Sequence, residues 1–427
     1  MRIMMMTNTY LPHVGGVARS VSAFSDALRR KGHDVLVVAP KFESMSANET
    51  DVVRVTALQK FNGSDFSVIV PSDGFLQEQL DAFRPDILHS HHPFLLGGAA
   101  QRLAAINSIP LVFTHHTLYE QYTHYAPGDS QFMKRFVAAL STEYANLAQL
   151  VIAPSESIRD LLGERGVFTP IQVIPTGVAE IFFNAGDGPA FRKVMGIPGN
   201  AFIVGHVGRL ALEKNLVFMA EAVARFMKGN PDAWFLLVGT GPALVEMESV
   251  FKKHKVEERV VSAGSLGQPI LTSAYRAMDV FAFASQSETQ GMVLTEAMAT
   301  RTPVVAIDAS GVREVLRDRQ NGIMLKRQSR SGFVSALQAL HDSSPQQRGR
   351  YRRSALQTAQ QFSLENCADQ LERQYQQLLS SSAVTNPEAV DAWETVRKKL
   401  SAEWSIVSNL SSAAGKALAG DNEHAHS

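Results

Sequence analysis

The sequence has almost no cysteine, no net charge and no long apolar run. Its one cysteine, Cys367, cannot form an intramolecular disulfide, which excludes a disulfide scaffold and a cysteine-rich metal site. No segment approaches the roughly 20 apolar residues that a membrane-spanning helix needs. The apolar start at residues 1–6 is interrupted by residues 7–9 and Pro12, too early for a signal peptide, so we expect a buried strand there.

The charge balance excludes one broad class of function. Forty-one basic residues balance forty-one acidic ones, which disfavours a protein whose main task is to neutralise nucleic-acid phosphates.

A length of 427 residues, with 45% apolar and 19% charged residues, is sufficient for two domains with complete hydrophobic cores. A lone cysteine is also typical of a reducing compartment, so we expect a cytoplasmic protein whose membrane contact, if it has any, is peripheral.

Short apolar runs alternate with longer helix-like segments along most of the chain. This rhythm predicts an α/β fold in which parallel sheets are covered by helices on both faces. The rhythm starts again in the second half, which predicts two Rossmann-like doubly wound domains. The expected strands are Ile3–Met6, Val35–Ala39, Ile87–His89, Leu111–Thr114, Val151–Ala153, Gln172–Ile174, Ile203–His206, Trp234–Val238, Val260–Ala263, Val280–Ala284 and Pro303–Ile307.

The linker between the two domains is expected near residues 175–178. We predict an N-terminal Rossmann-like domain at residues 1–177, a second Rossmann-like domain at 178–362 and C-terminal helices at 363–410 that pack back towards the N-terminal domain. A tail of small and polar residues at 411–427 is expected to be disordered. An amphipathic helix over 393–407 packs on the protein or on anionic lipid, and the sequence leaves both open.

Several unusual residues follow predicted strands of the first half, where doubly wound sheets bind ligands. Gly15 and Gly16 precede a predicted helix, so they make either a simple turn or a close approach to a phosphate at the helix N-terminus. His115 and His116 follow a strand and point to opposite faces if that strand persists, so at most one faces a ligand. We expect no metal there, because adjacent histidines rarely bind one ion and no second ligand set lies nearby in the sequence.

The second half carries a comparable strand, glycine loop and helix start. Gly208 and Arg209 are followed by Lys214, and Gly241 follows the next strand. Two cations beside a helix N-terminus can hold a diphosphate. An ordinary salt bridge from these cations to Glu213 or Glu221 is the alternative.

Two glutamates flank a further loop-to-helix junction. Glu288 precedes Gly291, and Glu296 lies in the predicted helix that begins there. At four-residue spacing Glu296 has no basic neighbour, so a buried carboxylate at this position needs hydrogen-bond donors from elsewhere. The hydroxyls of a ribose would serve.

Together these motifs resemble the family-4 retaining glycosyltransferases of the two-domain GT-B fold, over residues 1 to about 380. The resemblance implies that Glu296 holds the donor ribose, that Glu288 approaches the donor hexose and that His116 lies near the reacting sugar. It also implies that Arg209 and Lys214 neutralise the departing diphosphate. By the same resemblance, the domain at residues 1–177 is the acceptor side and the domain at 178–362 binds the nucleotide sugar.

The glycine-rich motifs match the family's donor-binding loops at Gly15, Gly208 and Gly241. By the same resemblance, Gly16 lets the N-terminal loop close on the diphosphate. The backbone amides near Gly291, Met292 and Val293 would meet the sugar or the diphosphate.

The segments around Leu95-Leu96-Gly97, residues 116–125 and residues 287–291 resemble the bacterial 1,2-diacylglycerol 3-glucosyltransferases within that family. This implies UDP-glucose as co-substrate, a lipid acceptor and contact with an anionic membrane. No Asp-x-Asp sequence is present, so we expect no cofactor and no metal. Arg301 departs from the family pattern, which has glycine at that position, and is expected to alter the loop before Pro303.

Three other functions remain open from the sequence. A family-4 transferase can act on a soluble sugar, glycan or polyol, and a nucleotide-sugar epimerase can share the fold. A non-catalytic nucleotide-binding module is the third alternative. The donor hexose, the acceptor and the oligomeric state cannot be chosen from the sequence.

Overall fold

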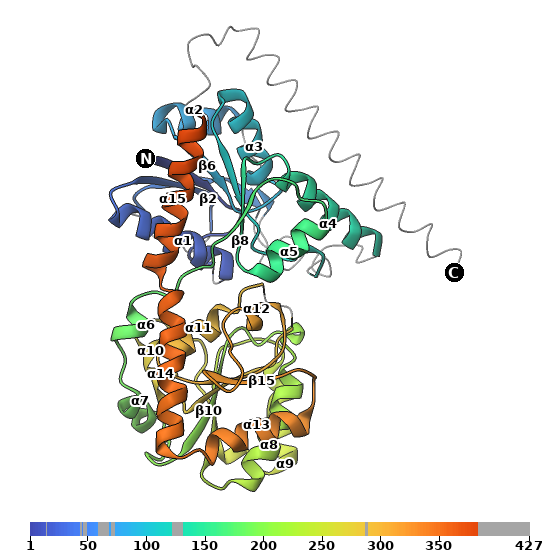
Figure 1. Ribbon diagram of the computed structural model, residues 1–427, viewed down its shortest axis with the longest axis vertical. Helices are drawn as coiled ribbons and strands as arrows, with labels where there is room; N and C mark the ends of the chain where they lie inside the picture. The colour runs from blue at the N-terminus through green and yellow to red at the C-terminus, as the bar shows by residue number, and fades with distance from the viewer. Residues whose placement is uncertain are drawn as a thin grey trace, which may run out of the picture. The chain divides into compact units, whose positions relative to one another are not determined.

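A computed structural model describes residues 1–13, 15–42, 45, 49–58, 68–69, 73–121, 131–286 and 289–382 (Figure 1). The chain divides into two compact units. Unit 1 contains Met1–Thr176 and the described residues from Cys367 onward, and unit 2 contains Gly177–Asn366. No helix within these described ranges is both long and apolar enough to cross a membrane.

Unit 1 is built on a seven-stranded sheet with strand order β3-β2-β1-β6-β7-β8-β9, in which every pair is parallel. A short antiparallel pair, β4 and β5, stands apart from it. Its strands are β1 (Arg2–Met6), β2 (Asp34–Pro40), β3 (Val52–Val55), β4 (Ala57–Leu58), β5 (Val68–Ile69), β6 (Ile87–Ser90), β7 (Leu111–Thr114), β8 (Leu150–Ala153) and β9 (Ile171–Val173). Its helices are α1 (Gly16–Arg30), α2 (Asp73–Phe83), α3 (Leu96–Asn107), η2 (Tyr119–Gln121), α4 (Gln131–Ala145) and α5 (Glu156–Glu164), joined by most of α15 (Leu364–Ser382).

The helix α15 is fastened to unit 1 by charged and buried polar contacts. Nζ of Lys31 lies 2.5 Å from Asp369 and 2.9 Å from Glu372, and the His33 ring approaches Glu372 at 3.1 Å. The hydrogen bond from Lys31 lowers the pKa of Glu372. Further along α15, the hydroxyl of the fully buried Tyr375 shares a 2.6 Å hydrogen bond with Nδ1 of His89 in β6.

Unit 2 is built on a six-stranded parallel sheet with strand order β12-β11-β10-β13-β14-β15. Its strands are β10 (Phe202–Val207), β11 (Ala233–Val238), β12 (Val260–Ser262), β13 (Val280–Phe283), β14 (Val304–Ile307) and β15 (Gly322–Leu325). Its helices are α6 (Ile181–Asn184), α7 (Gly188–Val194), η4 (Leu212–Lys214), α8 (Leu216–Gly229), α9 (Leu244–His254), η5 (Glu257–Arg259), α10 (Ile270–Ala277), α11 (Met292–Ala299), α12 (Ser310–Arg313), α13 (Arg330–His341) and α14 (Pro345–Gln361).

Side-chain alternation along each strand of unit 2 fills two separate cores. Val204 packs with α8, α9 and α13 on one face, whereas its neighbour Ile203 packs with α7, α10, α11 and α14 on the other. Because both faces are covered, the strands are continuous apolar runs rather than alternating ones. Figure 1 shows α8, α9 and α13 gathered in one part of unit 2 and α6, α7, α10 and α14 in another.

The predicted fold class is confirmed, and the expected strands differ from the observed ones by at most one residue at each end. Four observed strands were not among those expected: β3 and β15, which lie at the edges of the two large sheets, and the short pair β4 and β5. The predicted helix over 393–407 and the tail over 411–427 lie outside the described residues.

Arg301 occupies the left-handed position that ends α11. Its φ is +67°, in the left-handed region that favours glycine. Its N–H donates to the carbonyl of Met298, and the N–H of Thr302 donates to that of Ala297. These two bonds form a Schellman motif, with arginine at the position where glycine is most common.

Candidate active site

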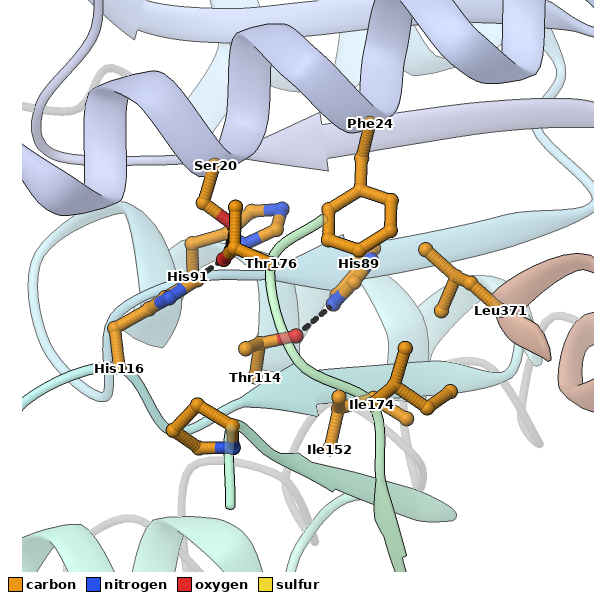
Figure 2. A pocket seen from close by; sticks show the side chains of 11 residues that line it. Ser20, Phe24, His89, His91, Thr114, His116, Ile152, Ile174, Thr176 and Leu371 are labelled. Carbon is orange, nitrogen blue, oxygen red and sulfur yellow. Dashed lines mark hydrogen bonds between the residues drawn. The ribbon is translucent and has the colours of Figure 1, made fainter. Parts of the chain in front are cut away.

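The C-terminal ends of β6 and β7 bring a cluster of histidines together in unit 1 (Figure 2). His89 belongs to β6, His91 follows it, and His116 follows the neighbouring strand β7. Nε2 of His89 shares a 2.7 Å hydrogen bond with Oγ1 of Thr114, and its Nδ1 shares a 2.6 Å bond with the hydroxyl of Tyr375. The adjacent parallel strands thus present their polar side chains at one edge of the sheet.

The three imidazoles lie in a row, with the His89 and His91 rings tilted and the His91 and His116 rings stacked. The ring centroids of His89 and His91 are 4.2 Å apart, and those of His91 and His116 are 5.2 Å apart. Nδ1 of His91 and Nε2 of His116 are 2.9 Å apart and share a hydrogen bond. The candidate residue His116 is therefore held by a second histidine that the sequence analysis did not select.

Burial keeps these histidines uncharged. It lowers the pKa of His89 and of His92 to about 3 and that of His115 to about 4. The pKa values of His91 and His116 are lowered well below the usual value by burial first, and then by the neighbouring imidazoles. At neutral pH the cluster acts through hydrogen bonds rather than through positive charge.

A small cavity of about 10 Å³ lies against this cluster, roughly the space for one water molecule. Ser20 of α1 and Thr176 add hydroxyl groups to its wall, and Thr176 donates a 2.8 Å hydrogen bond to Ser20. Apolar side chains, such as Phe24 and Leu371, form the rest of the wall in Figure 2. The cavity therefore has a mostly apolar wall with a few polar groups and is large enough for a water molecule only.

The two adjacent histidines after β7 have different surroundings, as strand alternation predicts. His116 lines the cavity. His115 is 1% exposed and packs edge-on against Phe113 and Tyr119. Of this adjacent pair, only His116 lines the cavity.

The glycine loop of unit 1 is anchored by a buried arginine. Gly15 precedes α1 with an extended backbone, and a side chain placed on Gly16 would meet only open space. Arg54 donates to the carbonyls of Leu11 and Pro40 at 2.6 and 2.8 Å, and its guanidinium also binds Glu49. This arginine fixes the chain just before the loop, although nothing in its sequence context marks it.

In unit 2 the glycine loops after β10 and β11 pack backbone against backbone. A Cβ on Gly239 would lie 1.9 Å from the carbonyl oxygen of Gly208, and one on Gly241 would lie 2.4 Å from that of Leu210. The Leu210 N–H also donates to the Thr240 carbonyl at 2.9 Å. Gly239 and Gly241 must therefore be glycines for the loop after β11 to pack against the backbone of Gly208 and Leu210.

The two candidate cations lie on the loop that follows Gly208. Arg209 is exposed and donates to Glu213 at 2.6 Å, so one of the two salt bridges considered from the sequence is present. Lys214 is half-buried at the end of η4. The other alternative partner, Glu221, instead binds Lys253 and His254.

The second glutamate of the predicted pair is buried and has a neutral donor. Glu296 is 5% exposed on α11, and the Tyr275 hydroxyl donates to its Oε2 at 2.7 Å. Gly291, at φ +70°, precedes α11, and Met292 and Val293 form its first turn. A partial positive charge at this helix end would favour an anion near those amides.

Some predicted features cannot be placed, and some useful residues were missed. Glu288 lies outside the described residues. The sequence does hold a signal for His91, since it follows β6 as His116 follows β7, but none for Tyr275. Within the described ranges, no group of three or more His, Cys, Asp or Glu side chains is arranged to hold a metal ion.

The comparisons with known proteins agree with the geometry of both units. The Glycosyltransferase Family 4 domain matches residues 14–180, and the Glycosyl transferases group 1 domain matches residues 187–358. The alpha-monoglucosyldiacylglycerol synthase of Streptococcus pneumoniae is 28% identical over 330 residues, which cover 76% of this chain and 75% of that protein. The GDP-mannose-dependent alpha-mannosyltransferase of Corynebacterium glutamicum is 30% identical over 340 residues, 76% of each chain.

Among solved structures, HepE of Anabaena in complex with UDP superposes with a TM-score of 0.71 at 20% identity. That superposition covers 88% of this chain and 100% of HepE, which is a glycosyltransferase of the GT-B fold. Sequence relatives and fold therefore agree. The chain belongs to the family-4 glycosyltransferases.

Proposed function

We propose that this chain transfers glucose from UDP-glucose to a 1,2-diacylglycerol at the cytosolic face of the membrane, with retention of the anomeric configuration. The observation that carries the proposal is the similarity to alpha-monoglucosyldiacylglycerol synthase over three quarters of both chains. The UDP bound by HepE supports a uridine nucleotide as the donor's leaving group. The motif around Thr289 and Gln290 supports a lipid acceptor.

The described residues supply positioning and charge for such a transfer. In the proposed step the bond from the anomeric carbon to the diphosphate oxygen breaks, and the acceptor oxygen bonds to that carbon on the same face. The acceptor proton passes to the departing phosphate oxygen. Arg209 and Lys214 would stabilise the diphosphate charge, Glu296 would hold the ribose, and His116 would meet the transferred sugar.

A soluble acceptor is the second candidate. The D-inositol 3-phosphate glycosyltransferase of Corynebacterium aurimucosum, which is 31% identical over 307 residues, supports a soluble acceptor. The mannosyltransferase of Corynebacterium glutamicum is slightly more identical to this chain than the diacylglycerol enzyme is. A GDP-sugar donor is equally part of that alternative. Because hexose epimers differ in one hydroxyl, a panel of sugar nucleotides is needed to distinguish UDP-glucose from a GDP-sugar as the donor.

The test is product identification. Purified protein is incubated with UDP-glucose, UDP-galactose or GDP-mannose, with and without vesicles of diacylglycerol and phosphatidylglycerol, and products are identified by mass spectrometry. A glucosyl diacylglycerol with the α configuration supports the proposal. A glycoside formed without vesicles, an epimerised donor or no product at all contradicts it.

Matched variants connect the product to the site. The variant His116→Ala should abolish transfer, whereas His254→Ala, which alters an ion-paired histidine of unit 2, should retain it. Both proteins should bind vesicles equally. Equal activity in the two variants would remove His116 from the mechanism.

A further inference from the structure

Three contacts hold His91 in place. Its backbone N–H donates to the carbonyl of Met6 at 3.0 Å, and its ring lies between those of His89 and His116. His91 is 1% exposed, and Nδ1 of its ring is 2.9 Å from Nε2 of His116. It therefore presents one defined nitrogen to the candidate site residue (Figure 2).

The other nitrogen of His91 decides the direction of this hydrogen bond. Nε2 is buried, and among the described residues it has no hydrogen-bond partner. A neutral imidazole carries one N–H and one lone pair. If Nδ1 accepted the bond, Nε2–H would be a buried donor without an acceptor, which costs about 1–3 kcal/mol. A buried lone pair without a donor is tolerated more often.

The rings of His91 and His116 are both neutral. Burial and the neighbouring imidazoles lower the pKa of each ring well below its usual value. The His91 N–H is then on Nδ1, and it donates to Nε2 of His116. A neutral imidazole that accepts at Nε2 carries its own proton on Nδ1.

We propose that His91 is a positioning residue that holds His116 in the tautomer with the proton on Nδ1. The Nε2 lone pair of His116 is then occupied by the His91 N–H and is not available as a base for the acceptor hydroxyl. This inference rests on the proposed function, because it assigns how the same site meets its substrate. It adds His91 to the residues on which transfer depends.

The tautomer can be measured without any substrate. In protein labelled with ¹⁵N-histidine at pH 7.5, His116 should show a protonated Nδ1 and an unprotonated Nε2, with its signals identified by their loss in His116→Gln. His206 serves as an internal reference, because its Nδ1 lies 3.0 Å from the carbonyl of Ala282 and must donate to it. A wild-type His116 that is protonated on Nε2 overturns the proposal.

Two substitutions then test the role of His91. In His91→Leu the bond is lost, and Nε2–H should appear on His116. In His91→Asn the side-chain amide occupies the place of Nδ1 and can still donate, so the Nδ1–H form should persist. An unchanged tautomer in His91→Leu contradicts the proposal, and where that variant does not fold, the wild-type and His91→Asn spectra still decide.

Kinetics separate this inference from the proposed function. We expect His91→Leu to lower kcat about tenfold to a hundredfold, the loss typical when the partner that orients a functional histidine is removed. The KM for UDP-glucose should change little, and His91→Asn should recover most of the activity. A wild-type protein without transferase activity contradicts the proposed function alone, whereas wild-type kcat in His91→Leu contradicts the positioning role alone.

Discussion

The hydroxyl of Tyr275 donates a 2.7 Å hydrogen bond to Oε2 of Glu296 inside unit 2. Both residues are at most 5% exposed, so the bond is shielded from water. It joins α10 to α11 and fixes the carboxylate that the family resemblance assigns to the donor ribose. Because burial of a carboxylate without hydrogen bonds is costly, this donor helps to hold Glu296 in place.

The variant Tyr275→Phe should remove this bond without removing the ring. We expect the free energy of unfolding to fall by about 1–3 kcal/mol, because the buried carboxylate loses a donor. The KM for the nucleotide sugar should rise, since the orientation of Glu296 is no longer fixed. Urea denaturation and donor titration measure the two effects. Tyr351→Phe on α14 is the control, and an equal effect in that variant would show that the hydroxyl bond is not responsible.

The variant Arg301→Gly should stabilise unit 2. The left-handed backbone of Arg301 favours glycine, and relief of this strain should raise the free energy of unfolding by about 1 kcal/mol. The charge of Arg301 also contributes to a lowered pKa of Arg276, after burial. Arg301→Ala removes the same charge but retains a Cβ, so it should not reproduce the gain. If both variants stabilise equally, charge rather than backbone conformation is the cause.

The variant Arg54→Met should loosen the chain before Gly15. A buried guanidinium that binds Leu11, Pro40 and Glu49 contributes several charge-assisted hydrogen bonds, and its loss should lower the free energy of unfolding by about 3 kcal/mol. Arg30→Met on the exposed end of α1 is the control and should be nearly neutral. Thermal unfolding measures both, and a neutral Arg54→Met would show that the loop does not depend on this anchor.

The histidine cluster should make unit 1 sensitive to acid. His89 and His92 have a pKa of about 3 in the folded protein and near the usual 6.5 when unfolded. Below pH 6.5 the unfolded chain therefore binds more protons than the folded protein. The free energy of unfolding should be highest above that pH and should fall as the pH falls towards 3. Each histidine should contribute a slope of about 1.4 kcal/mol per pH unit. Urea midpoints between pH 7.5 and 5 measure this, and pH-independent midpoints would contradict it.

The sequence was sufficient for the fold because both sheets are buried on two faces. Continuous apolar strands such as Val304–Ile307 are visible in sequence, whereas the edge strand Val52–Val55 is less buried and was missed. The residues of the site likewise fall into those that the sequence marks and those that it does not. Residues that follow strands, such as His116, carry a positional signal. Tyr275 meets Glu296 only through the packing of two helices, which no local pattern encodes.

The candidate diphosphate site should work without a metal ion. Arg209 and Lys214 lie on the loop that packs against Gly241, and they carry the positive charge that a metal would otherwise supply. Activity should therefore survive an excess of EDTA, and Arg209→Ala or Lys214→Ala should each lower kcat by about a hundredfold or more. Glu213→Gln is the matched variant, because it removes the partner of Arg209 without removing the cation, and it should leave kcat within a few-fold of the wild type. A strict requirement for Mg²⁺ or Mn²⁺ would contradict this assignment, since the two cations would then not suffice for the leaving diphosphate.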